Sequence, residues 1–135
     1  MGQSKPFRAT ALIVEDDPMQ RDMMAMLLEE SDYDVIACES AEAAELILNK
    51  PGNRLVLLMT DVNLAGQMSG VELAHIAKQQ QPRLNVVVTS GRPLSEPLPG
   101  DTKFWSKPWA PLDVLREAEV ALNTADPAAE EQRRD

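Results

Sequence analysis

The stretch Leu12–Pro18, LIVEDDP, decides how this chain folds and where its chemistry lies. An aliphatic run leads directly into Glu15, Asp16 and Asp17, with no basic residue among them. Two like charges about 4 Å apart repel by about 4 kcal/mol at an effective dielectric constant near ~20. Such a cluster is unfavourable unless solvent or a cation neutralises it. The pattern therefore predicts a buried strand whose end needs compensation of negative charge.

The length and charge of the chain limit its possible roles. Its 135 residues suffice for one domain, and 22 acidic against 13 basic residues give a formal charge of −9. No cluster of Lys or Arg interrupts this balance, so direct binding to DNA, RNA or an anionic membrane is not expected. The beginning of the chain, MGQSKPFR, lacks the apolar core of a signal peptide, and we expect a soluble, cytoplasmic protein.

Cysteine and histidine are nearly absent. Cys38 has no second cysteine to pair with, and its apolar surroundings predict a small buried strand residue. His75 lies in a helical pattern and is expected at the surface or boundary of that helix. Chemistry based on paired imidazoles or on a Ser-His-Asp triad is therefore disfavoured.

Strand and helix patterns alternate along the chain. Aliphatic runs predict strands, each buried on both faces, over residues 9–14, 34–38, 55–60, 84–89 and 103–106. Periodic apolar residues predict helices over residues 18–30, 40 or 41–50, 71–81 and 112–123. In the first helix, the apolar stripe assigned to the core comprises Met19, Met23, Met26 and Leu27.

This alternation predicts an α/β fold, doubly wound, with a five-stranded parallel sheet and helices on both faces. We expect one domain over residues 8–123, with disordered ends at residues 1–7 and 124–135. Asp17 followed by Pro18 is expected to cap the first helix, and Ser40 the second. In such sheets, ligands bind at the carboxyl ends of the strands.

Five polar side chains follow the predicted strands at that edge of the sheet. They are Glu15, Asp16, Asp61, Thr89 and Lys107. Carboxylates can hold Mg²⁺ or Mn²⁺, and a hydroxyl and an ammonium can stabilise the oxygens of a transferring phosphoryl group. The alternative is that these residues only solvate loops. The combination favours phosphoryl transfer to a carboxylate.

At this point the chain resembles the receiver domain of two-component response regulators, which is CheY-like, in a stand-alone form with a shortened fourth-helix region. The strings that carry the resemblance are LIVEDDP, LLMTDVNLAGQMSGVEL, VVVTSG and FWSKPW. The resemblance implies a flavodoxin-like sheet with strand order 2-1-3-4-5.

The resemblance also implies roles for individual residues. Asp61 corresponds to the phosphoacceptor, which receives its phosphoryl group from a histidine kinase or phosphotransfer protein. Glu15, Asp16 and Asp61, with the backbone carbonyl of Asn63, correspond to the ligands of Mg²⁺ (or Mn²⁺). Asn63 also corresponds to one of two positions that tune hydrolysis of the acyl phosphate, and Gly91 to the other.

Three further positions correspond to the catalytic and switching residues of the family. Thr89 and Lys107 correspond to the groups that assist phosphorylation. Thr89 also resembles the switch hydroxyl, and Phe104 the switch aromatic. The bond between Lys107 and Pro108 is expected to be cis, as the resemblance implies.

Two segments depart from the family pattern. Residues 91–100, GRPLSEPLPG, contain three prolines and two glycines, which disfavour the helix that receivers carry between the switch hydroxyl and the lysine. We expect an extended segment or a single turn there, held by Leu94 and Leu98 against the sheet. The loop LAGQMSG is expected to move freely because it contains Gly66 and Gly70.

The leading functional interpretation is a single-domain signalling or relay module with an unknown downstream protein partner. Such a module is not an enzyme beyond catalysing its own phosphorylation and dephosphorylation. Alternatives are a receiver domain of a hybrid histidine kinase, a docking-only receiver, or an unrelated doubly wound enzyme such as a flavin protein or an aspartyl phosphatase. The enzyme alternative is disfavoured, because the chain lacks a G-x-x-x-x-G-K-[ST] loop and a carboxylate two residues after Asp61.

Overall fold

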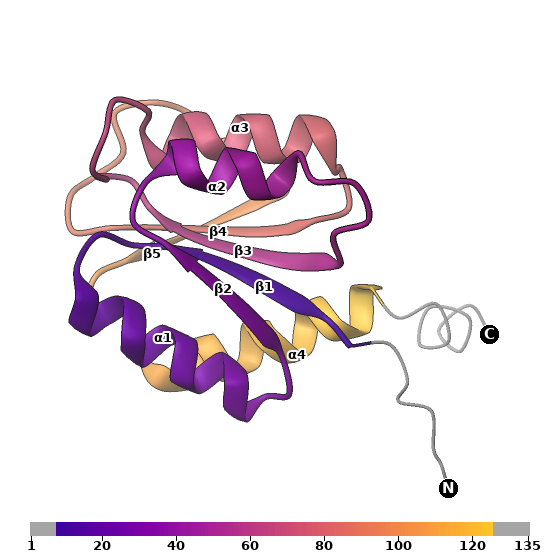
Figure 1. The fold of residues 1–135 in the computed structure, drawn as a ribbon. Coiled ribbons are helices and arrows are strands. Elements are labelled where there is room, and N and C mark those ends of the chain that lie inside the picture. Colours follow the sequence, from indigo (N-terminus) through magenta and orange to yellow (C-terminus); the bar gives the residue numbers. More distant parts are fainter. Residues whose placement is uncertain (1–7, 126–135) are drawn as a thin grey trace, which may run out of the picture.

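The structure, a computed structural model, describes residues 8–125 (Figure 1). Its elements alternate as expected, and their ends lie within two residues of the predicted ones. In chain order they are β1 Thr10–Val14, α1 Pro18–Glu30, β2 Asp34–Cys38, α2 Ala41–Leu48, β3 Leu55–Asp61, α3 Gly70–Gln80, β4 Asn85–Ser90, β5 Thr102–Ser106 and α4 Pro111–Ala125. The ends predicted to be disordered lie outside the described residues over 1–7 and 126–135. The prediction is wrong for Thr124 and Ala125, which are the last two residues of α4.

The five strands form one parallel sheet in the order β2-β1-β3-β4-β5, which confirms the predicted fold. Helices α2 and α3 cover one face, and α1 and α4 cover the other (Figure 1). Burial on both faces is confirmed for the inner strands β1, β3 and β4 but is wrong for β2 and β5, which are half exposed. These two strands are the edges of the sheet, and Cys38 on β2 is accordingly only half-buried.

Each face of the sheet contributes to its own apolar core. Under α1 and α4, the buried residues include Ile13, Leu28 and Met59. Alternate residues of the same strands, such as Leu12 and Leu58, lie under α2 and α3. The inner strands are therefore continuous aliphatic runs because successive side chains enter opposite cores.

The apolar stripe predicted for α1 is wrong for its three methionines, whereas Leu27 is half-buried against the core as predicted. The exposed fractions of Met19, Met23 and Met26 are 75%, 46% and 55%, and the residues that α1 buries are Met24 and Leu28. Met19, Met23 and Met26 share one face of α1, but that face points to solvent, so a helical spacing of methionines does not by itself identify the face that meets the sheet. None of the helices in the described part of the chain has the length and apolar content needed to cross a bilayer.

Tyr33, which follows α1, joins this helix region to α4. Its ring is 1% exposed, and its hydroxyl donates to the backbone carbonyl of Ala118 at 2.6 Å. Burial raises the pKa of this phenol, so that it remains a donor at neutral pH. We predict that Tyr33→Phe lowers the free energy of unfolding by about 1 kcal/mol. Urea denaturation with an unchanged m-value would check this, and no loss of stability would contradict it.

No helix forms between β4 and β5, as predicted, in residues 91–101. Leu98 is half-buried against the core under α2 and α3, which confirms its expected packing, whereas Leu94 lines a surface hollow instead. The exposed His75 on α3 donates from its Nε2 to the carbonyl oxygen of Pro97 at 3.0 Å. This segment is therefore fastened to the neighbouring helix without helical structure of its own.

Candidate functional site

The end of β1 places the first two acidic residues at the edge of the sheet. The backbone N–H of Glu15 donates to the carbonyl of Cys38 at 3.0 Å, which extends the ladder by one residue. Glu15 is buried, and Asp16 is exposed. Asp17 caps α1 as predicted, because its Oδ1 accepts from the backbone N–H of Met19 at 3.1 Å.

Strand register brings the other acidic and hydroxyl residues alongside. Val14 pairs with Thr60, so Glu15 and Asp61 follow at the ends of neighbouring strands. Asp61 pairs directly with Thr89 on β4. The backbone N–H of Lys107 donates to the carbonyl of Ser90 at 2.9 Å, which fixes the lysine just beyond β5.

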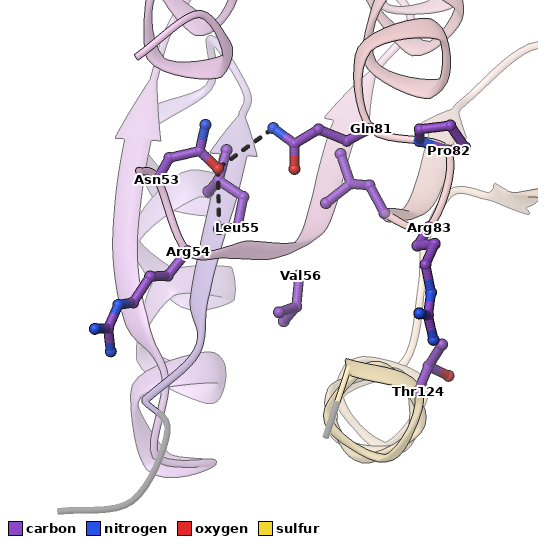
Figure 2. Close-up of a pocket in the computed structure, with 9 residues that line it drawn as sticks. Asn53, Arg54, Leu55, Val56, Gln81, Pro82, Arg83 and Thr124 are labelled. Carbon is purple, nitrogen blue, oxygen red and sulfur yellow. Dashed lines mark hydrogen bonds between the residues drawn. The ribbon is translucent and has the colours of Figure 1, made fainter. Parts of the chain in front are cut away.

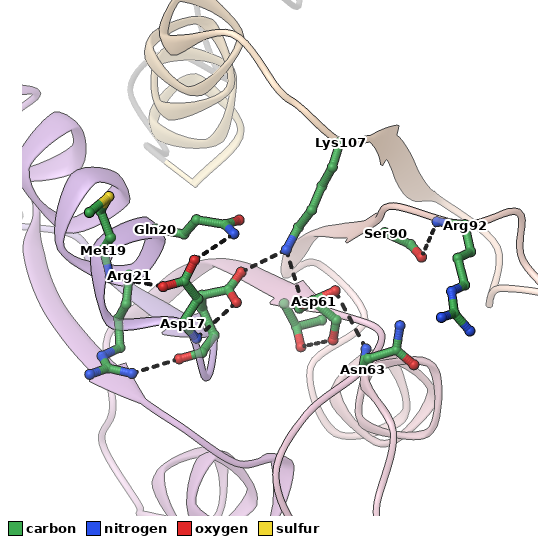
Figure 3. Close-up of polar contacts among 11 residues, drawn as sticks. Asp17, Met19, Gln20, Arg21, Asp61, Asn63, Ser90, Arg92 and Lys107 are labelled. Atoms are coloured by element: carbon green, nitrogen blue, oxygen red, sulfur yellow. Dashed lines mark hydrogen bonds and ion pairs between the residues drawn. The ribbon is translucent and has the colours of Figure 1, made fainter.

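The predicted site residues converge on one cluster. One carboxylate oxygen from each of Glu15, Asp16 and Asp61 lies within 4.8 Å of the others. Lys107 reaches across from the far side of the site (Figure 3), and its Nζ lies 3.1 Å from Oε1 of Glu15 and 3.0 Å from Oδ2 of Asp61. The Lys107–Pro108 bond is cis, as predicted.

Burial and charge act in opposite directions in this cluster. Burial raises the pKa of Glu15, although the backbone N–H of Asp17 and the ammonium of Lys107 oppose the shift. Burial lowers the pKa of Lys107, but hydrogen bonds to Asp61 and Glu15 outweigh it and raise the pKa overall. Three carboxylates against one ammonium leave two negative charges, which fits a divalent cation bound through oxygen.

Thr89 offers a hydroxyl to the same space. Its Oγ1 is buried and finds no hydrogen-bond partner among residues 8–125. Buried polar groups almost always have a partner, so an unpaired hydroxyl beside a carboxylate cluster suggests a ligand that it meets in another state. A phosphoryl oxygen has the required chemistry.

The remaining predicted positions surround this cluster at different depths. Asn63 is exposed, and its backbone N–H donates to Oδ1 of Asp61 at 3.4 Å. Gly91 is exposed, with open space where a side chain would stand. Phe104 is half-buried, pairs with Val88 and packs in the core under α2 and α3 rather than in the cluster itself.

The two glycines in the loop after β3 serve close contacts, which differs from the expected freedom of movement. A Cβ on Gly70 would stand 1.9 Å from the backbone carbonyl oxygen of Asp61, so only glycine allows α3 to begin there. Gly66 has φ of +92° and faces the carboxylate of Glu42. The loop is fitted to its neighbours at both positions.

Sequence reasoning missed three residues that support the site. Arg21 donates from Nη1 to the backbone carbonyl of Glu15 at 2.9 Å, and Gln20 donates from Nε2 to Oδ2 of Asp17 at 2.8 Å (Figure 3). Glu42 accepts hydrogen bonds from the loop after β3. Arg21 and Gln20 lie in the first turns of α1, and their closeness in sequence to Glu15 and Asp17 could have indicated these contacts. Nothing in the sequence around Glu42 indicates its contact with the loop after β3.

A second hollow lies at the opposite end of the strands from the acidic cluster, next to the start of β3 and just before the start of β4 (Figure 2). Its volume is about 460 Å³, and Gln81 donates from Nε2 to Oδ1 of Asn53 at 3.3 Å within it. Among residues 8–125, those that line it include Arg54 and Arg83 but none with a carboxylate. The acidic cluster is therefore the stronger candidate for chemistry.

Comparison with known proteins agrees with this geometry. The family described as the response regulator receiver domain matches residues 11–96. The chain belongs to this family. The receiver is 32% identical over 121 residues to the response regulator receiver protein CpdR of Brucella abortus, and the match covers 84% of this chain and 97% of CpdR. It is also 29% identical over 124 residues to an Arabidopsis thaliana protein named as a two-component response regulator, of which it spans 20%.

Solved structures share the fold. A response regulator receiver protein from Sinorhizobium medicae superposes with a TM-score of 0.78 at 22% identity, over 88% of this chain and 98% of that one. A CheY-like receiver domain protein from Methanospirillum hungatei superposes with a TM-score of 0.76 at 23% identity, over 88% and 97%. The family acts in two-component signalling, and the fold and the position of the cluster are those that its sheet topology predicts.

Proposed function

We propose that this receiver accepts a phosphoryl group on Asp61 from the phosphohistidine of a histidine kinase or a phosphotransfer protein, in a reaction that depends on Mg²⁺ or Mn²⁺. The observation that carries the proposal is the position of the Asp61 carboxylate, which lies within an acidic cluster and is contacted at 3.0 Å by the ammonium of Lys107. An acceptor carboxylate, a cation site and a fixed positive charge are the parts that this transfer needs.

In the proposed step, a carboxylate oxygen of Asp61 attacks phosphorus, the P–O bond forms, and the P–N bond to the donor imidazole breaks. The leaving imidazole takes up a proton and becomes neutral histidine. Lys107, already at hydrogen-bond distance from Asp61, stabilises charge on the transferred oxygens. The hydroxyl of Thr89, paired with Asp61 in register, donates to another of these oxygens.

The residues present fit a divalent metal. Glu15, Asp16 and Asp61 would hold it, together with the backbone carbonyl of Asn63. When bound, the metal supplies positive charge that draws the phosphoryl oxygens toward the acceptor. The two uncompensated negative charges of the cluster and its oxygen-only donors favour Mg²⁺ or Mn²⁺ over softer metals.

We assign signalling roles to four residues around the phosphoryl group. Thr89 and Phe104 change position on phosphorylation, and Asn63 and Gly91 set the lifetime of the acyl phosphate. The open space at Gly91 leaves water free access from that side. Residues 8–123 act as one receiver domain, and the 97% coverage of CpdR supports a single-domain signalling or relay role. The excess of acidic residues favours a downstream protein over DNA as the partner, and we place the receiver in the cytoplasm.

The direct test is formation of an adduct on the whole chain. Beryllofluoride or a small acyl phosphate donor, with and without Mg²⁺, is followed by tryptophan fluorescence and intact mass. A single adduct that requires Mg²⁺ supports the proposal. The absence of any adduct would favour a docking-only receiver.

Replacing Thr89 with valine is expected to change stability and chemistry in opposite directions. Valine keeps the shape of threonine but removes the buried, unpaired hydroxyl, so the free energy of unfolding of the metal-free receiver should rise by about 1 kcal/mol. The rate of phosphorylation should fall by roughly 10² because a donor to the transferred oxygens is lost. Urea denaturation and the time course of labelling measure the two effects.

Thr102→Val is the matched control for this variant. Thr102 also carries a buried hydroxyl without a partner among the described residues, but it lies at the start of β5, away from the cluster. It should show the gain in stability and an unchanged labelling rate. Equal labelling rates in the two variants would remove Thr89 from the proposed role.

A further inference from the structure

The loop between β3 and α3, residues 62–69, is held to the start of α2 by one side chain. Oε2 of Glu42 accepts hydrogen bonds from the backbone N–H groups of Gln67 at 3.0 Å and of Met68 at 2.9 Å. A single parallel bridge pairs Ser40 with Ala65 next to it. Residues 65–68 follow β3 and are therefore fastened to the start of α2, which follows β2. The strand β1 lies between β2 and β3 in the sheet.

The backbone at Gly66 makes room for this contact. A Cβ built on Gly66 would stand 2.5 Å from Oε1 of Glu42, and the φ of +92° is one that side-chain-bearing residues rarely adopt. The glycine and the carboxylate are thus fitted to each other. We call this contact of Glu42 with residues 65–68 the loop clamp.

The ends of the loop are fixed by other contacts. At its start, the backbone N–H of Val62 donates to the carbonyl of Thr89 at 2.9 Å. At its end, the side chains and backbones of Ser69 and Glu72 form a capping box. The exposed Asn63 lies between these ends, and its backbone contact with Asp61 is long, at 3.4 Å. The N–H of Gly70 donates to the carbonyl of Val62 at 2.9 Å and closes the base of the loop. Asn63 is the first residue beyond that closure, so its position depends on how the following residues are held.

The charge of Glu42 is suited to this contact. Hydrogen bonds from the backbone N–H groups of Met68 and Gln67 hold the pKa of this carboxyl below its usual value. Glu42 also lies in the first turn of α2, where the helix dipole favours a negative charge. The carboxylate is therefore ionised at neutral pH, as two N–H donors require.

We propose that Glu42 is a positioning residue for the phosphoacceptor site, which it serves by clamping the loop that carries Asn63. This inference rests on the proposed function, because it concerns the same metal and acceptor. When the clamp is lost, the loop gains freedom, the backbone of Asn63 is no longer held beside Asp61, and the metal binds more weakly. Glu42 does not touch the reacting atoms, so chemistry at saturating metal is preserved.

The experiment compares Glu42→Ala with Glu42→Gln and Glu45→Ala on the whole chain. In the structure one oxygen, Oε2, accepts both hydrogen bonds, so the carbonyl oxygen of glutamine can replace it. Glu45→Ala removes the same charge from the same helix without touching the loop. Amide hydrogen exchange at Gln67 and Met68 is measured without metal, and Mg²⁺ affinity is measured by tryptophan fluorescence.

Glu42→Ala should speed exchange at these two amides by roughly tenfold and weaken Mg²⁺ binding by roughly tenfold, as loss of an outer-shell contact does. Its labelling at saturating Mg²⁺ should match the wild type. Glu42→Gln and Glu45→Ala should stay close to the wild type in all three measurements. Rescue by glutamine separates positioning from a general effect of charge.

Faster exchange in Glu42→Ala with unchanged Mg²⁺ affinity would overturn the positioning role, and unchanged exchange would overturn the clamp itself. If Glu42→Ala does not fold by circular dichroism, Gly66→Ala disturbs the same contact from the other side and must weaken Mg²⁺ binding in its place. Failure of the wild type to label would overturn the proposed function. That failure is recognised separately, because hydrogen exchange needs neither metal nor phosphoryl donor.

Discussion

Replacing Asp61 with asparagine is expected to abolish phosphoryl labelling of the receiver while leaving its fold intact. The amide has nearly the shape of the carboxylate but lacks the anionic oxygen that attacks phosphorus, so labelling should fall by at least roughly 10³. The variant also removes one of three clustered negative charges. The loss of this repulsion offsets the loss of the ion pair with Lys107, which keeps its contact with Glu15. The thermal midpoint should therefore stay near that of the wild type. Intact mass after incubation with a phosphoryl donor and Mg²⁺ measures the effect.

Asp17→Asn is the matched control for this result. Asp17 lies beside the cluster, but its carboxylate caps α1, and asparagine is an equally good cap. The control should label at the rate of the wild type. Labelling of Asp61→Asn at that same rate would show that another residue accepts the phosphoryl group.

Much of the candidate site was predictable because a parallel sheet gathers strand ends at one edge. The aliphatic run before Glu15 and the run before Asp61 belong to neighbouring strands, with Val14 opposite Thr60. In a parallel sheet, residues that follow neighbouring strands lie close together even when many positions separate them in the sequence. That is why side chains 46 positions apart, Asp61 and Lys107, could be expected to meet, and they do so at 3.0 Å.

The orientation of α1 was not predictable in the same way. Met19, Met23 and Met26 follow a helical spacing, but the helix buries the face containing Met24 and Leu28 instead. Which face meets the sheet is decided by packing with α4 and β1, not by local periodicity. The result is an exposed methionine surface on the helix that begins at the acidic cluster.

The loop clamp shows a second limit of sequence reasoning. A glutamate in the first turn of a helix is ordinary, and a glycine in a loop is usually interpreted as flexibility. Their contact joins Glu42 to residues 25 and 26 positions further along the chain. Only the fold shows that Gly66 packs against the carboxylate of Glu42, where a larger residue would clash.

The segment between β4 and β5 was easier, because its prolines act locally. Residues 91–101 form no helix, and residues 92–96 among them border a hollow of about 510 Å³ together with Asn63 and Glu72. Proline in the interior of a helix removes a hydrogen bond and clashes with the preceding turn, so three prolines within ten residues leave no room for a regular helix. The hollow beside Asn63 depends on how this segment packs against α3, which composition does not specify.

Lys107→Gln is expected to lower both the stability of the metal-free receiver and its rate of labelling. Without the ammonium, the buried carboxylates of Glu15 and Asp61 lose their compensating charge, and the metal-free receiver should be less stable by about 3 kcal/mol. Labelling should slow by roughly 10² because the transferred oxygens lose a cation. Mg²⁺ should restore much of the stability but not the rate, since it binds the folded cluster and adds no ammonium.

Lys103→Gln distinguishes these effects from the loss of any lysine. Lys103 is also on β5, and its Nζ lies 2.8 Å from Oε1 of the buried Glu117, remote from the acceptor. This control should also be less stable than the wild type, and the difference between the two should be the same with and without Mg²⁺. Its labelling rate should match that of the wild type. Denaturation with EDTA and with Mg²⁺, together with labelling rates, compares the two variants. If Mg²⁺ stabilised both equally, the ammonium of Lys107 would not share its carboxylates with the metal, and the site as proposed would be wrong.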